Sequence, residues 1–227
     1  MKQYIKSYHL FLTRWWFRGI IYLVYPTLLL LLPGFLGSKV PDFTYCNNEE
    51  SYKHFTLLLL HTLWDLTVSV EIFGDYFIMG GIAAKDTNKL EYLKTSIKGI
   101  PVLTKALTAD GIRRLLSIAI IAGIGSPFCR PNLNVVSGIA ISLTIFCFTE
   151  AGLIVTRHFP SMLVNCITAS VIMTFMTACI NLLLKTPAMV QIMLPLLLAI
   201  IISFLGRWLI LKKARNSYYD NRPENSL

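Results

Sequence analysis

Long blocks of apolar residues, separated by short charged connections, dominate the pattern of this chain. A helix needs about 20 mostly apolar residues to cross about 30 Å of hydrocarbon. Six blocks approach that length, which predicts an all-α membrane protein with six transmembrane helices in one domain, residues 1–227. The predicted spans are residues 19–36, 55–84, 115–125 (with 112–114 extending its start), 135–155, 162–184 and 190–210. The third has the shortest uncharged stretch.

The two ends of the chain differ in pattern from these blocks. Residues 1–18 place large aromatic side chains at helical spacing, with basic residues elsewhere around the helix. The aromatic positions are Tyr4, Tyr8, Phe11 and Trp15, and the basic ones Lys2, Lys6 and Arg14. This pattern predicts a helix lying in the membrane interface, the alternative being a plain cytosolic extension of the first span. Residues 216–227 are polar and are expected to form a flexible tail.

Composition removes the soluble alternative. The chain is 55% hydrophobic and 15% charged, whereas a soluble domain carries roughly a quarter charged residues. The net charge of +9 would suggest nucleic acid in a soluble protein. Here the charges lie between apolar blocks, so we expect them to face anionic lipid and to set the topology, and we expect no nucleic-acid partner.

The charges of the connections predict the orientation. Residues 1–18 hold four cations and no acids, residues 85–114 seven cations and three acids, and the chain from Arg207 five cations and two acids. Residues 37–54 hold two cations and three acids. Because basic connections stay inside, six spans place both termini and residues 85–114 in the cytosol and residues 37–54 outside.

Four carboxylates fall within the predicted spans: Asp65, Glu71, Asp75 and Glu150. Carboxylates are costly in hydrocarbon and usually face a cavity, a partner helix or the interface. Spacing predicts an acidic stripe of the first three on one face of the second span. The stripe indicates either a polar translocation surface or ordinary hydrogen bonding between helices. For Glu150, the simplest expectation is an ion pair with Arg157, about two turns further on.

The cytosolic connection carries the most distinctive pattern. Leu90, Leu93 and Ile97 recur at helical spacing, and Gly99 stands where a helix C-cap glycine belongs, before Pro101. A second short helix is expected at residues 103–107. The result is a short amphipathic helix parallel to the membrane, which either docks on a cytosolic partner or contacts lipid only.

The strings GGIAAKDTNKLEYLKTSIKG and LTADGIRRLLS resemble the permease subunits of type-2 ABC transporters. The six spans, the interfacial helix and the cytosolic termini are also similar to that family. The resemblance implies two facing permease copies in a bacterial cytoplasmic membrane, with two separate ATPase subunits that bind ATP and Mg²⁺. It further implies an ATPase-coupling helix formed by Leu90, Glu91, Leu93, Lys94, Ile97, Lys98 and Gly99. Many members have a re-entrant hairpin before the last span, for which residues 185–187 leave little room.

Other chemistry is limited by what the sequence lacks. No GxxxxGK[ST] string occurs, so ATP hydrolysis is expected in a partner, and no HExxH or GxSxG motif indicates an enzyme. No metal site or cofactor is expected in this chain. Cys46 and Cys129 would share the outer face, where a disulfide is conceivable. The resemblance favours an exporter of an amphipathic peptide, a lipid-like molecule or a hydrophobic drug. The alternative is a small substrate-binding subunit of an importer, or an unrelated membrane enzyme.

Overall fold

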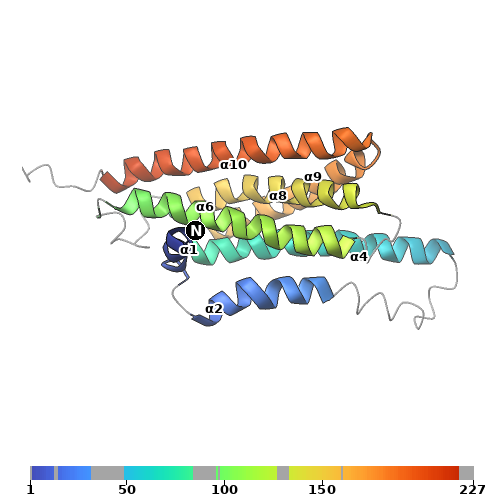
Figure 1. Ribbon diagram of the computed structural model, residues 1–227, viewed down its shortest axis with the longest axis horizontal. Helices are drawn as coiled ribbons and strands as arrows, with labels where there is room; N and C mark the ends of the chain where they lie inside the picture. Colours follow the sequence, from blue (N-terminus) through green and yellow to red (C-terminus); the bar gives the residue numbers. More distant parts are fainter. Residues whose placement is uncertain are drawn as a thin grey trace, which may run out of the picture.

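The computed structural model describes residues 2–12, 15–31, 49–83, 96, 98–126, 133–159 and 161–219. In these residues every regular element is a helix, which confirms the all-α prediction. Figure 1 shows the long helices running along one common direction. The elements are α1 (Lys2–His9), α2 (Trp15–Gly19), η1 (Ile20–Val24), α4 (Glu49–Ile78), α6 (Gly99–Ile118), η3 (Ala119–Ile124), α8 (Val135–His158), α9 (Met162–Leu183) and α10 (Ala188–Tyr219).

Four helices in the described residues are long and apolar enough to cross a membrane, so the protein is membrane-embedded. They are Phe55–Ile78, Val135–His158, Met162–Leu183 and Ala188–Asn216. They overlap the predicted second, fourth, fifth and sixth spans. A shorter apolar helix, Trp15–Leu31, overlaps the predicted first span, and η3 with the end of α6 overlaps the predicted third.

Helix α8 forms the centre of the bundle because it packs against α10, α9 and α4. The core between these helices includes Trp64, which is fully buried and donates a hydrogen bond from Nε1 to Ser126 Oγ at 3.1 Å. Small residues let α8 approach η3 closely. A Cβ added to Gly138 would lie 3.0 Å from the carbonyl oxygen of Gly123, as is usual where membrane helices cross through glycines.

The N-terminal helix docks on protein, and it is shorter than predicted. α1 ends at His9, and a new helix begins at Trp15. Tyr8 and Leu12 are buried with Leu103 and Leu107 of α6 in a second apolar cluster. Of the four predicted aromatic positions, Tyr8 and Phe11 are buried, whereas Tyr4 and Trp15 are exposed. The prediction of one helix over residues 1–18 is therefore wrong, because the helix ends at His9 and residues 10–11 form a turn.

The connection between the predicted second and third spans also differs from its prediction where the structure describes it. Gly99 is the first residue of α6, and the helix continues without a break to Ile118. Pro101 lies in the first turn, where its missing N–H is not needed. The predicted C-cap at Gly99 and the separate helix at residues 103–107 are therefore wrong. The glycine with a positive φ among the described residues is Gly81, at 70°, in the turn after α4.

The last two helices form a hairpin that packs on α8. α9 and α10 are joined by the turn at residues 184–187, so residues 161–219 contain no re-entrant hairpin. α10 contains Pro195 and extends beyond the predicted end of the sixth span at residue 210.

Candidate functional site: a buried ion-pair network

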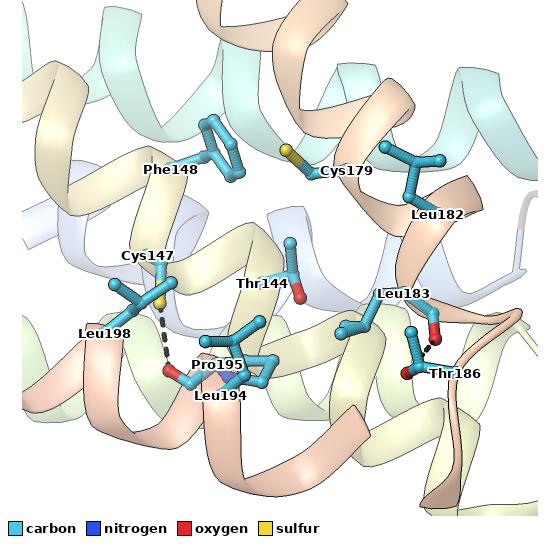
Figure 2. Close-up of a pocket in the computed structure, with 10 residues that line it drawn as sticks. All are labelled: Thr144, Cys147, Phe148, Cys179, Leu182, Leu183, Thr186, Leu194, Pro195 and Leu198. Atoms are coloured by element: carbon cyan, nitrogen blue, oxygen red, sulfur yellow. Dashed lines mark hydrogen bonds between the residues drawn. The ribbon is translucent and has the colours of Figure 1, made fainter. Parts of the chain in front are cut away.

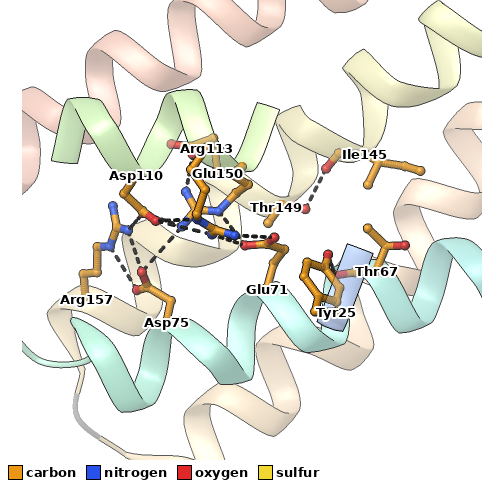
Figure 3. Close-up of polar contacts among 11 residues, drawn as sticks. Tyr25, Thr67, Glu71, Asp75, Asp110, Arg113, Ile145, Thr149, Glu150 and Arg157 are labelled. Carbon is orange, nitrogen blue, oxygen red and sulfur yellow. Dashed lines mark hydrogen bonds and ion pairs between the residues drawn. The ribbon is translucent and has the colours of Figure 1, made fainter. Parts of the chain in front are cut away.

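Seven charged side chains meet inside the bundle, and Figure 3 shows six of them with labels, on α4, α6 and α8. Helix α4 supplies Glu71 and Asp75, one turn apart on its buried side. Helix α6 supplies Asp110, Arg113 and Arg114, which spacing of three and four places on one face. Helix α8 supplies Glu150 and Arg157. All seven side chains are at most 9% exposed.

Arg114 is the centre of this network, since its guanidinium reaches all four carboxylates. Its Nε donates to Glu71 Oε2 at 3.1 Å, and its Nη1 donates to Glu150 Oε1 at 2.5 Å. Its Nη2 donates to Asp110 Oδ2 at 2.5 Å and lies 3.5 Å from Asp75 Oδ1. One side chain of α6 is thereby bonded to both α4 and α8.

The other two arginines form bidentate pairs. Arg113 donates from Nη1 and Nη2 to the two oxygens of Glu71, at 3.0 and 2.6 Å. Arg157 donates from Nε and Nη2 to the two oxygens of Asp75, at 3.0 and 2.6 Å, and its Nη2 also donates to Asp110. The planar guanidinium matches a carboxylate in this fork geometry, which fixes orientation as well as distance.

The network is close to neutral but not balanced. Four carboxylates face three guanidiniums, which leaves one formal negative charge. Burying such charges is costly unless each is paired and hydrogen-bonded, and an unpaired one is strongly destabilising. The three helices are therefore held in one register by groups that cannot separate without leaving a buried charge alone.

A cavity of about 100 Å³ adjoins the network on the side of η1. Glu71, Asp75, Asp110 and Arg113 line it, opposite apolar side chains of α2, η1 and α4. Tyr25, which follows η1, also lines it, and its hydroxyl donates to the carbonyl of Thr67 at 3.5 Å. The cavity is larger than the roughly 30 Å³ that one water occupies in the liquid.

Tyr8 of α1 lies near the same charges. Its side chain is 1% exposed, and its hydroxyl has no hydrogen-bond partner among the described residues. Burial raises the pKa of Tyr8 well above its ordinary value, and the charge of Asp110 raises it further. The phenol is therefore neutral at any physiological pH.

The network accounts for three of the four predicted intramembrane acids, though not in the predicted arrangement. Glu71, Asp75 and Glu150 meet in it, but Asp65 is partly exposed and does not join. The predicted single stripe is therefore wrong, because ten residues do not complete whole helical turns. Glu150 pairs with Arg114, whereas Arg157 pairs with Asp75 and Asp110, so the expected Glu150–Arg157 pair is also wrong.

Sequence reasoning missed the α6 half of the site. Asp110, Arg113 and Arg114 were counted as cytosolic charges, but the structure buries them. Their spacing of three and four residues could have indicated the site, since it places one acid and two bases on one helix face. The neighbouring predicted span carries acids that need partners.

Other predicted residues lie partly outside the described residues. Of the coupling segment, the structure describes Lys98, the N-cap of α6, and Gly99. The positions outside are Leu90, Glu91, Leu93, Lys94 and Ile97, together with both members of the proposed disulfide, Cys46 and Cys129.

The described residues include no group of three or more His, Cys, Asp or Glu side chains placed to hold a metal ion. The arrangement instead suits a structural or conformational role, since every carboxylate in it accepts from a guanidinium. No known protein family, curated protein or solved structure matches the chain.

Proposed function

We propose that this chain is the transmembrane subunit of an ATP-driven exporter. Two copies form the translocation path, and separate ATPase subunits, which bind ATP and Mg²⁺, dock on the cytosolic connection. Each copy spans a bacterial cytoplasmic membrane six times, with both termini in the cytosol. The helix Trp15–Leu31 and the run from the end of α6 through η3 supply the first and third spans.

The ion-pair network is the observation that carries this proposal. Helix α6 begins at Gly99, the last residue of the proposed coupling segment, and its Asp110, Arg113 and Arg114 bind α4 and α8. A displacement of the connection would therefore move α6, α4 and α8 together rather than bend one helix. A transporter driven by an external ATPase needs such rigid transmission into its spans.

A polar stripe on α4 supports the second copy. His61, Asp65 and Ser69 follow one another at four-residue spacing, and each is partly exposed. His61 Nε2 and Asp65 Oδ1 are themselves buried and have no hydrogen-bond partner among the described residues, whereas Ser69 donates to Met173 Sδ of α9 at 3.3 Å. A carboxylate left without a partner in a membrane span is costly. A facing copy would remove the stripe from lipid and would line a polar path with it, along which an amphipathic peptide, a lipid-like molecule or a hydrophobic drug could move.

The first test is purification of the tagged chain from its native membrane. An ATPase without a membrane domain should copurify, and this subunit should alter its ATP hydrolysis after reconstitution. A stable chain that copurifies with no ATPase would contradict the proposal and favour a binding subunit or an enzyme.

The second test uses Leu93→Asp, which places a carboxylate in the proposed apolar docking face, where its desolvation costs a few kcal/mol. ATPase stimulation and export should both be lost while membrane level stays normal. Thr104→Asp is the matched control, because Thr104 is exposed on α6. Unchanged stimulation and export in Leu93→Asp would refute the coupling segment.

A further inference from the structure

A second cavity, of about 320 Å³, lies between α8, α9 and α10 (Figure 2). It lies near the turn that joins α9 to α10. The residues that α8 contributes to it precede those that α8 contributes to the ion-pair network. Its lining residues are Thr144, Cys147, Phe148, Cys179, Leu182, Leu183, Thr186, Leu194, Pro195 and Leu198.

The cavity exists because α9 and α10 both pack on α8 but scarcely on each other. Thr144, Cys147 and Phe148 of α8 form its floor. The Cys147 thiol donates to the carbonyl oxygen of Pro195 at 3.2 Å, which ties α8 to α10 below the opening. Cys179, Leu182, Leu194 and Leu198 on the two walls are exposed, so the cavity opens sideways. Since α9 and α10 are membrane spans, it opens toward hydrocarbon.

The hydroxyl groups of the lining and the Cys147 thiol already make hydrogen bonds within the protein, which favours an apolar ligand. Thr144 donates to the carbonyl of Ala140 at 2.8 Å, and Thr186 donates to that of Leu183 at 2.7 Å. With the Cys147 thiol also bonded, the floor and end offer no spare donor to a polar ligand. The remaining walls are apolar, and a cavity of this kind stays dry and takes an apolar occupant.

One cation is the neighbour in sequence of a residue that lines the cavity. Lys185 is exposed in the turn between α9 and α10, next to the lining residue Thr186. Lysines at the end of a span extend toward the lipid phosphates. We propose that the cavity binds one acyl chain of an anionic phospholipid, whose phosphate pairs with Lys185. This site does not depend on the transport function or on the orientation of the chain in the membrane.

The test is native mass spectrometry of the full chain, delipidated in detergent and then titrated with phosphatidylglycerol. One bound lipid should persist per chain. Cys179→Trp, which fills the cavity, should abolish this binding. Cys166→Trp should not, because Cys166 is an exposed position of α9 that does not line the cavity. Leu198→Trp should repeat the loss from the α10 wall, and thermal unfolding should verify that each variant is folded.

The headgroup is tested separately. Lys185→Gln should weaken phosphatidylglycerol binding by about fivefold, the ratio for about 1 kcal/mol per lysine near an anionic surface. The proposal is overturned if the lipid is retained in Cys179→Trp, if both tryptophan variants lose it equally, or if Lys185→Gln has no effect.

Discussion

Arg157, at the end of α8, binds both carboxylate oxygens of Asp75, which lies 82 residues earlier on α4. The same corner is held by backbone hydrogen bonds. The N–H of Gly81 donates to the carbonyl of Thr156, and the N–H of Ala83 donates to that of Arg157, both at 3.2 Å. The turn after α4 thereby satisfies carbonyls that the end of α8 would leave unpaired. The end of α4 and the turn that follows it are thus fixed to α8 by charge and by backbone.

The centre of the network should be its most sensitive position. Arg114→Gln leaves four carboxylates facing two guanidiniums, and we expect a loss of about 3–5 kcal/mol in the free energy of unfolding. Thermal unfolding in detergent would measure this loss.

Glu150→Gln is the matched control for that experiment. Glu150 accepts from Arg114 through Oε1, and a glutamine oxygen can still accept there. Because the substitution also removes the excess negative charge, its effect on the unfolding temperature should be small. Equal destabilisation by both variants would contradict the charge count.

The crossing of α8 and η3 should tolerate no side chain. Gly138→Val would push Cβ against the backbone oxygen of Gly123, 3.0 Å away, and should cost about 1–3 kcal/mol. Gly74→Ala on α4 meets nothing within 4 Å and should leave stability unchanged or slightly raised. Thermal unfolding of both variants would measure the cost of a side chain at this crossing. An unchanged unfolding temperature in Gly138→Val would contradict the close approach of α8 and η3.

The hydroxyl of Tyr8 should contribute nothing to stability. It is buried without a partner among the described residues, so Tyr8→Phe should leave the free energy of unfolding unchanged or raise it by about 1 kcal/mol. Tyr8→Ala, which removes the ring from its contact with α6, should lower it by several times that amount. A marked loss in Tyr8→Phe would show that the hydroxyl is hydrogen-bonded.

Membrane topology can be tested by labelling single cysteines introduced after removal of the native ones. An impermeant reagent added to intact cells should label position 48 and not position 94. This follows from the charges of residues 37–54 and 85–114. With Asp110, Arg113 and Arg114 buried, the connection retains five of its seven cations and two of its three acids, so its basic excess remains. Labelling at 94 with none at 48 would reverse the orientation.

The sequence by itself determined the elements that the bilayer dictates. A helix must satisfy its own backbone in hydrocarbon, so run length and apolar content suffice to locate α8, α9 and the spanning part of α4. The same reasoning placed α10 but not its end, because a helix can continue past the membrane without an apolar run. It also indicated that Glu71, Asp75 and Glu150 needed partners.

Only the tertiary structure decided what those partners are. Arg113 and Arg114 stand 42 and 43 residues from Glu71, and nothing in a local pattern states which helix α6 will face. Charge counting places a basic cluster at the membrane edge, whereas the packing of α6 against α1, α8 and α10 places it inside, where each of its charges is paired and hydrogen-bonded. The cavity at Cys179 has the same origin, since it depends on how closely α9 and α10 approach each other on α8.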